Sequence, residues 1–327
     1  MKIELRHGAG GEDTGKLIAE YFAKAFDNEY LQKMEDGAVL PVMQGNPVFT
    51  SDSFVVEPLS FPGGDIGKLA ICGTVNDLAC MGAKPLYLTA SFILETGLET
   101  ETLEQIIKSM ADTAKEAGVK IVAGDTKVVE GKGGLFINTA GLGERAKEIN
   151  ISASNLQPGD KIIVTGTLGD HHAVILTQRL HIALAAESDC APLNGMVQDL
   201  LQKGITLHTV RDITRGGLAT VANELAEASQ VKICLEEEML PVKEAVQGLC
   251  GILGLEPINM GNEGKLFIAV PEAEAEKALE IIKSNPYGKD AAIVGEVVPG
   301  NGVRLITALG GSRRVLPLRG EGLPRIC

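Results

Sequence analysis

Apolar positions in the first half of the chain recur at two different periods. They follow helical spacing through residues 66–81 and, more regularly, through residues 102–117, where Gly118 ends the pattern. Apolar runs typical of strands lie around them, at residues 38–50, 119–123 and 134–142. The first half is therefore predicted to be an α/β domain in which strands and helices alternate.

The second half begins after a polar stretch that ends in the turn pair Pro158-Gly159. Strands are predicted at residues 161–165 and 266–270. Helical spacing recurs at residues 171–179, 196–203, 217–228, 243–252 and 272–283. We therefore expect an α+β second domain. The predicted limits are residues 1–150 for the first domain, 151–316 for the second and 317–327 for a C-terminal tail.

The tail carries the last cysteine of the chain. Pro317, Gly320, Gly322 and Pro324 interrupt the hydrogen bonding of helices and strands alike, so a flexible segment is predicted. Fully extended, its eleven residues reach about 36 Å, and they end in Cys327. On the tail alone, two interpretations stay open: a frayed end that happens to carry a cysteine, or a tethered thiol that enters an active site.

Composition excludes several classes of protein. The 327 residues carry a net charge of −13 without a basic block, so no nucleic-acid partner is expected. No apolar run approaches the roughly 18 residues of a membrane helix, and Glu4 and Arg6 stand where a signal peptide needs apolar residues. The six cysteines form no C-x-x-C pair and mostly have apolar neighbours, as in a reducing cytosol. A globular cytoplasmic protein without a membrane partner is predicted.

A glycine-rich stretch opens the chain at His7-Gly8-Ala9-Gly10-Gly11. Glycines let backbone N–H groups approach an anion closely, and successive N–H groups form a phosphate nest. The stretch is not a Walker A loop, because no Gly-Lys-Ser/Thr follows it. A flexible N-terminal turn and a loop that closes over phosphates explain it equally well.

Four aspartates stand where a hard cation could bind. Asp52 and Asp125 lie at the ends of predicted strands. Asp77 follows Asn76 inside an otherwise apolar helix, which Asp65 precedes. Mg²⁺ takes one or two carboxylates together with nucleotide phosphates, and these positions suit it. The alternatives are a helix N-cap for Asp65 and turn formation for Asp52 and Asp125, whereas Asp77 has no capping role.

Two stretches of the second half carry further candidate groups. Residues 210–219, VRDITRGGLA, run from a strand through a glycine turn into a helix, which is a good anion site. Residues 259–266, NMGNEGKL, place Glu263 between glycines in front of a strand. A hairpin turn and a functional carboxylate explain Glu263 equally well.

In combination, these motifs identify a family. The chain resembles the HypE family of hydrogenase maturation factors, within the PurM-like (aminoimidazole ribonucleotide synthetase-related) superfamily, through HGAGG, FTSDSFVVEP, FPGGDIGKLA, GTVNDLACMGAKP, AGDTKVVE, VRDITRGGLA, GNEGKL and the terminal PRIC. The resemblance covers essentially the whole chain, and FPGGDIGKLA, GNEG and PRIC are its most specific parts. The departures, GAGG for GSGG, SDS for TDS and GDHH for GDHG, remove no carboxylate.

The resemblance implies a fold and an activity. The fold is PurM-like, with an α/β N-terminal domain, an α+β C-terminal domain and ATP in the cleft between them. Homodimers form in this superfamily through N-terminal strands that complete a barrel. The implied reaction is the ATP-dependent dehydration of a carbamoyl group on Cys327 to a thiocyanate. The carbamoyltransferase HypF supplies the carbamoyl group, and a HypC–HypD complex accepts the cyanide for the iron of [NiFe]-hydrogenase.

The resemblance also assigns roles to single residues. It implies Mg²⁺ and triphosphate binding by Asp52, Asp77 and Asp125, support from Asp65 and Asn76, and closure over the phosphates by Gly8, Gly10 and Gly11. Lys127 lies two residues after Asp125, so on a strand both side chains point to the same face. In the role that the resemblance implies, its ammonium would neutralise charge on the phosphate. Without the resemblance, a solvated strand-end charge explains Lys127 better. Glu263 would be the deprotonating base and Cys327 the carrier of the substrate.

Two rival functions follow from the same residues. The first is another ATP-dependent synthetase of this superfamily, of the selenophosphate or purine-pathway type. Selenophosphate synthetases use a reactive cysteine near the N-terminus, and this chain has no cysteine before Cys72. The second is a non-catalytic thiol carrier that has lost ATP binding, against which the set Asp52, Asp77, Asp125 and Lys127 argues.

Overall fold

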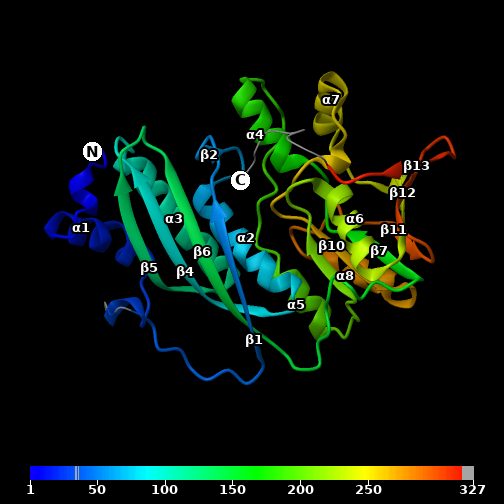
Figure 1. Ribbon diagram of the computed structural model, residues 1–327, viewed down its shortest axis with the longest axis horizontal. Coiled ribbons are helices and arrows are strands. Elements are labelled where there is room, and N and C mark those ends of the chain that lie inside the picture. The colour runs from blue at the N-terminus through cyan, green and yellow to red at the C-terminus, as the bar shows by residue number, and fades with distance from the viewer. Residues whose placement is uncertain (34, 36, 319–327) are drawn as a thin grey trace.

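The computed structural model describes residues 1–33, 35 and 37–318, which form two units side by side (Figure 1). The first unit contains a four-stranded sheet covered by two long helices. Its elements are η1 (Leu5–Gly8), α1 (Glu12–Leu17), η2 (Ile18–Ala23), η3 (Leu31–Lys33), β1 (Asn46–Phe54), β2 (Ser60–Phe61), β3 (Gly64–Asp65), α2 (Ile66–Cys80), β4 (Lys84–Glu95), α3 (Thr100–Ala117), β5 (Lys120–Val129) and β6 (Leu135–Arg145).

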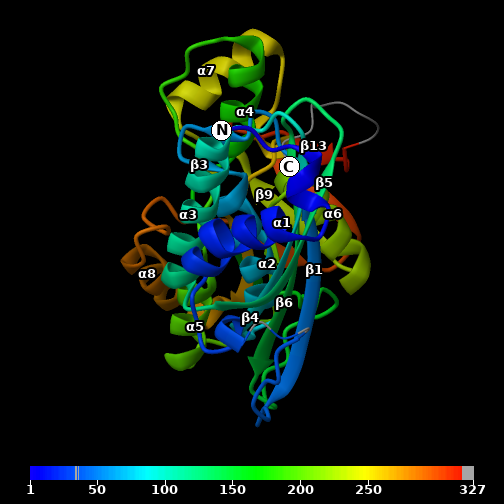
Figure 2. The same ribbon diagram turned by 90° about the vertical axis from the view of Figure 1, so that its left-hand side faces the viewer.

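The four-stranded sheet has the strand order β1-β6-β4-β5. Its pairs are antiparallel except β4 with β5, which are parallel because α3 connects them. Side chains of β4 alternate between a buried face, with Ala90 and Phe92, and an open face, with Tyr87 and Ile93. Figure 2 shows α2 and α3 on the same side of the strands. One face of the sheet is therefore covered by helices, and the other carries exposed apolar side chains.

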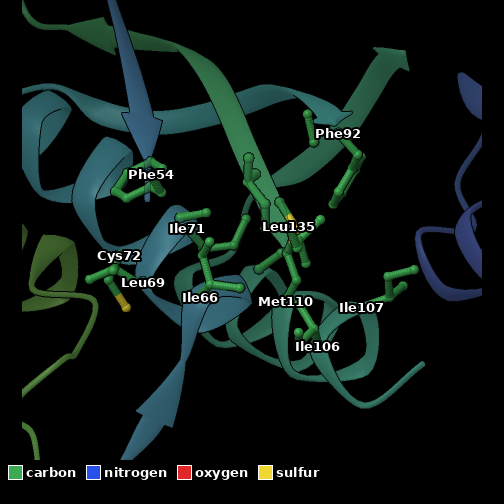
Figure 3. Packing of buried hydrophobic residues seen from close by; sticks show 14 of the residues in the cluster. Phe54, Ile66, Leu69, Ile71, Cys72, Phe92, Ile106, Ile107, Met110 and Leu135 are labelled. Carbon is green, nitrogen blue, oxygen red and sulfur yellow. The ribbon is translucent and has the colours of Figure 1, made fainter. Parts of the chain in front are cut away.

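The core of the first unit lies between this sheet and its helices (Figure 3). Phe92 and Leu135 project from the sheet, Leu69 comes from α2 and Met110 from α3, and all four are buried. The helix α2 is apolar around most of its circumference, which is typical of a helix buried on all sides. It packs against the sheet and also against β8 (Thr209–Asp212) and α5 (Asn194–Gln202) of the second unit. Residues of α2 are thus placed at the boundary between the two units.

The second unit is built on a seven-stranded sheet of order β13-β12-β9-β11-β7-β10-β8. Its strands pair antiparallel except β12 with β9. Its elements are β7 (Asp160–Val164), α4 (Asp170–Leu180), α5 (Asn194–Gln202), β8 (Thr209–Asp212), α6 (Gly217–Ser229), β9 (Lys232–Glu236), η4 (Glu237–Met239), α7 (Glu244–Leu253), η5 (Pro257–Asn259), β10 (Leu266–Pro271), η6 (Glu272–Glu274), α8 (Ala275–Ser284), β11 (Ala292–Val298), β12 (Gly302–Ile306) and β13 (Ser312–Val315).

A strap of irregular structure, residues 181–193, joins the second unit to the first. It follows α4 and lies against the helix α2 and the β2–β3 hairpin. The backbone N–H of Ser188 donates to the carbonyl of Pro62 at 2.8 Å. The side-chain amide of Asn76 on α2 donates to the carbonyl of Ala191 at 3.0 Å and accepts from the backbone N–H of Leu193 at 2.8 Å. The strap therefore fixes the two units relative to one another.

Most predicted helices are confirmed to within a few residues, but the strands of the first half were predicted less well. The expected strand at residues 38–50 begins only at Asn46, and β4 was not foreseen at all. The helical segments that follow the N-terminal glycines were also missed. Among the described residues, no helix has the length and apolar character needed to cross a membrane. The description ends at Leu318, so most of the predicted tail, residues 317–327 with Cys327, lies outside the described residues.

Candidate functional site

A cleft of about 540 Å³ lies between the two units. Strand β1 and helix α2 supply Asp52 and Asp77 from the first unit. Strand β8 and the turn before β10 supply Asp212 and Glu263 from the second unit. The structure thus brings together three of the residues singled out in the sequence, and adds Asp212.

Alternation along β1 and helical spacing along α2 bring the first two aspartates together. Thr50 and Asp52 lie on the face of β1 that is covered by α2. The hydroxyl of Thr50 donates to Asp77 Oδ2 at 2.8 Å. The hydroxyl of Thr74, three residues before Asp77 on the helix, donates to Asp52 Oδ2 at 3.1 Å. Each carboxylate is therefore oriented by a threonine of the other element.

The carboxylates that line the cleft outnumber its positively charged side chains. Burial, together with the nearby Asp52 and Asp212, raises the pKa of Asp77 from 3.8 to about 7. Burial likewise raises the pKa of Asp52 and of Asp212. Crowded carboxylates with raised pKa values suit a hard divalent cation, which would neutralise them. Sequence analysis considered residues 210–219, VRDITRGGLA, only as an anion site and so missed Asp212 as a candidate metal ligand. Its position at the end of a strand, like that of Asp52, could have indicated this role.

Glu263 enters the cleft from a turn that is held on two sides. Its side chain is only 4% exposed. The neighbouring Asn262 is fully buried; its Oδ1 accepts from the backbone N–H of Gly169 at 2.7 Å and its Nδ2 donates to the carbonyl of Ile213 at 2.9 Å. On the other side, Asp189 of the strap accepts from the backbone N–H of Glu263 at 3.1 Å. These contacts fix the turn relative to both the strap and the end of β8.

Asp125 and Lys127 do not reach this cleft within one chain. They pair in register with Ser91 and Ile93 of β4, so they project from the open face of the sheet, whereas Asp52 projects from the covered face. Three strand spacings, about 14 Å, also separate β5 from β1. The sequence-based grouping of Asp52, Asp77 and Asp125 in one metal site is thus not met in the single chain.

The two residues on the open face pair with each other. Lys127 Nζ lies 2.7 Å from both carboxylate oxygens of Asp125. This contact lowers the pKa of Asp125. Both side chains are largely exposed. They form a separate, solvent-facing group.

The N-terminal glycines lie beside this second group. The segment η1 packs on β5, and a Cβ on Gly8 would stand 2.7 Å from Cβ of Val128. Gly10 has a φ of +80°, and its N–H donates to the hydroxyl of Thr14 at 3.0 Å. Gly11 is the N-cap of α1. The glycines are therefore next to the strand of Asp125 and Lys127 and not next to the aspartates of the cleft.

Two further residues predicted to support the nucleotide have structural roles. Asp65 caps α2 and accepts from the backbone N–H groups of Gly67 and Lys68 at 2.8 and 2.9 Å. Asn76 is buried, and both ends of its amide are used by the strap. Neither side chain lines the cleft. Within the single chain the two residues hold α2 and the strap in place, and their support of the nucleotide stays a prediction.

Known proteins resemble this chain over its whole length. Residues 34–145 match the family described as AIR synthase related protein, N-terminal domain, and residues 157–308 match AIR synthase related protein, C-terminal domain. The chain is 49% identical over 337 residues to the carbamoyl dehydratase HypE of Escherichia coli K12, with 99% of each chain covered. It is 46% identical to the carbamoyl dehydratase HypE of Azotobacter vinelandii, with 99% of this chain and 97% of that one covered.

Solved structures give the same result. A structure of the hydrogenase maturation protein HypE in complex with ATP is similar with a TM-score of 0.95 at 43% identity, and 99% of both chains is covered. A HypE–HypF complex is similar with a TM-score of 0.81 at 51% identity, and covers 92% of this chain and 99% of that one. A thiamine-monophosphate kinase at 20% identity, with a TM-score of 0.68, shares the fold alone.

Proposed function

Since this chain belongs to the HypE family of carbamoyl dehydratases, we propose that it uses ATP to dehydrate a carbamoyl group on Cys327 to a thiocyanate. The cyanide is passed on for the iron centre of a [NiFe]-hydrogenase. The observation that carries this assignment is the cleft in which Asp52, Asp77 and Asp212 face Glu263. It combines groups for nucleotide binding with a candidate base.

Two steps turn the amide oxygen into a leaving group and then remove it. First, the carbamoyl oxygen attacks the γ-phosphorus of ATP, the bond to the bridging oxygen breaks, ADP leaves with the electron pair, and the nitrogen loses one proton. Second, the remaining N–H proton is removed, the C≡N bond forms, and phosphate leaves with the electrons of the C–O bond. The overall change is S–C(=O)NH₂ plus ATP to S–C≡N, ADP and phosphate.

Glu263 is the proposed base for the second step. Its side chain is 4% exposed and lines the cleft, where a carboxylate can accept a proton from a bound substrate. The contacts of Asn262 and Asp189 on either side hold its backbone in place. A base that is fixed before the substrate arrives costs no reorganisation during the reaction.

The cofactor that best suits the cleft is Mg²⁺. Asp77, whose pKa is raised to about 7 by burial and by its acidic neighbours, and Asp52 and Asp212 are the residues that would hold it. When bound, Mg²⁺ supplies charge neutralisation for the triphosphate. Asp212 takes the place that sequence analysis gave to Asp125 within one chain.

The proposed substrate is the chain's own terminal thiol. The description ends at Leu318, whose backbone N–H donates to the hydroxyl of Thr220 on α6 at 3.3 Å. Nine further residues lead to Cys327 and span at most about 30 Å. Because α6 begins two residues after Arg215, which lines the cleft, the tail starts on an element that borders the site.

We further propose that a second copy covers the open face of the four-stranded sheet. Phe49 is 70% exposed there and Ile93 44%, which leaves apolar surface that a partner would bury. Asp125 and Lys127 lie on this same face. In such a homodimer they would act in the cleft of the partner subunit.

A mixing experiment tests this arrangement. Glu263→Gln and Lys127→Met chains, each inactive alone, are mixed and allowed to exchange subunits. If the two residues act in one site from different chains, about a quarter of the wild-type activity returns, since half of random dimers are mixed and one of their two sites is intact. If both residues act within one chain, the mixture stays inactive.

HypF is the proposed donor of the carbamoyl group, supported by the solved complex of HypE with HypF. A HypC–HypD complex is the proposed acceptor of the cyanide, and the cytoplasm the proposed location. The direct test of the function is the intact mass of the C-terminal peptide after incubation with HypF, carbamoyl phosphate and ATP. Thiocyanate adds one cyano group in place of a hydrogen on Cys327. A peptide that keeps the carbamoyl mass without release of ADP would favour a non-catalytic carrier, and a peptide that never reacts would refute the role of Cys327.

A further inference from the structure

Two arginines flank Asp212 in the turn between β8 and α6, and they differ in their partners. Arg211 lies 3.5 Å from Glu224 through Nη2 and 3.9 Å from Asp212 through Nε. Arg215 is exposed, and its guanidinium makes no hydrogen bond or ion pair with any residue that the structure describes. Both arginines line the cleft. Arg215 is therefore a cation at the cleft whose hydrogen-bond donors are still available.

The backbone places Arg215 at a defined point. It is followed by Gly216 and Gly217, which have φ values of +81° and +63°. A Cβ on Gly217 would stand 2.5 Å from the carbonyl oxygen of Ile258, and one on Gly216 would stand 2.3 Å from Oγ1 of Thr220. Both positions therefore require glycine, because a side chain at either would be strained and would meet neighbouring atoms.

The cleft is lined by more negative than positive side chains, so a cationic side chain is needed beside a bound triphosphate. Its described lining contains the four carboxylates of Asp52, Asp77, Asp212 and Glu263, while its positive side chains are the two arginines alone. Arg215 already acts on this group, since its charge lowers the pKa of Asp52 against the larger effect of burial. One divalent cation leaves a triphosphate and these carboxylates incompletely neutralised. Arg211 is engaged by Glu224, so the available donor is Arg215.

We propose that Arg215 is a catalytic residue whose guanidinium binds the γ-phosphoryl group while it passes from ATP to the carbamoyl oxygen. This inference rests on the proposed function. The bond between γ-phosphorus and the bridging oxygen breaks as the new P–O bond forms, and ADP takes the electron pair. Arg215 keeps its protons throughout and stabilises the charge on the transferring oxygens by two parallel N–H donors. The same group then faces the departing phosphate.

Three variants test the role of Arg215. Arg215→Met is expected to lower single-turnover ADP formation by the carbamoylated chain at saturating Mg-ATP by about 10²–10³-fold, because a preorganised charge donor is lost. Arg215→Lys keeps the positive charge but not the paired N–H donors of the guanidinium, so its rate should lie between those of Arg215→Met and wild type. Arg304→Met, which changes an exposed arginine of β12 outside the cleft, is the matched control and should stay within a few-fold of wild type. Equal losses in the two methionine variants, or a normal rate in Arg215→Met, would overturn the proposal.

A binding measurement makes the test independent of carbamoyl chemistry. ADP with Mg²⁺ and aluminium fluoride imitates a phosphoryl group in transfer. The wild-type chain should bind this mixture more tightly than Mg-ADP alone, and Arg215→Met should bind both equally, with an unchanged melting temperature. A wild-type chain that makes no thiocyanate but still shows this Arg215-dependent difference would refute the proposed dehydration and retain the phosphoryl role. Equal tightening in the variant would refute the role of Arg215.

Discussion

Replacing Asp77 by asparagine should stabilise the metal-free protein above neutral pH. The pKa of Asp77 is raised from 3.8 to about 7, so the folded state binds its proton more tightly than the unfolded chain does. The contribution of this proton to the free energy of unfolding is complete below about pH 4, and it is lost as the pH rises through about 7. Asparagine avoids this loss because it carries no charge, and its Oδ1 can still accept from the hydroxyl of Thr50.

The magnitude follows from the shift. About three pKa units at roughly 1.36 kcal/mol each correspond to a loss of up to about 4 kcal/mol in the free energy of unfolding between the two limits. Since the side chain is only half-buried, solvent screening reduces this figure. A net stabilisation of about 2 kcal/mol for Asp77→Asn at about pH 8, absent at about pH 4, is the expected outcome.

Thermal melting in the presence of a chelator, followed at several pH values, measures this difference. Asp199→Asn, which changes an exposed carboxylate on α5, is the matched control and should show no such trend. Addition of Mg²⁺ at high pH should raise the melting temperature of the wild type and leave that of Asp77→Asn unchanged. A destabilisation by Asp77→Asn that is equal at both ends of the pH range would contradict the electrostatic argument.

Three further outcomes are expected. Cys327→Ala should abolish modification and leave Mg-ATP affinity nearly intact, as measured by peptide mass and calorimetry; modification on another cysteine would refute the role of the tail. Glu263→Gln should accumulate the carbamoyl adduct with ATP bound and slow thiocyanate formation by about 10²–10⁴-fold in a timed mass measurement; normal dehydration would move the base elsewhere. Asp65→Ala should lower the free energy of unfolding by about 1 kcal/mol through the lost N-cap, with unchanged ATP affinity in calorimetry.

The sequence predicted the helices better than the strands for a physical reason. Helical spacing recurs over many turns in residues such as Leu103, Ile106 and Met110, and each repeat strengthens the prediction. Strand β4 offers only a short repeat of this kind. Leu88, Ala90, Phe92 and Leu94 alternate with outward-facing residues, but the apolar Ile93 on the open face and the irregularity between Pro85 and Tyr87 interrupt the period of two.

The sequence alone did not indicate which face of the sheet each predicted site residue occupies. Asp52 and Asp125 both end strand-like runs, and nothing in the sequence distinguishes their faces. The pairing of β5 with β4 shifts by one residue between Leu88 and Thr89 of β4. Beyond this shift, the odd-numbered residues of β5, including Asp125, lie on the open face of the sheet. Lys127 follows Asp125 onto that face, as its spacing of two had predicted.

The cleft is assembled from two units, so its chemistry depends on the segments that hold them together. Asp52 and Asp77 belong to the first unit, and Glu263 belongs to the second. The strap contacts both, since Asp189 holds the backbone of Glu263 while Asn76, one residue before Asp77, holds the strap. The distance between the nucleotide-binding carboxylates and the base is therefore set by buried hydrogen bonds outside the cleft. A change in those bonds would alter the second chemical step more than the binding of ATP, because the carboxylates of the first unit are oriented by their own threonines.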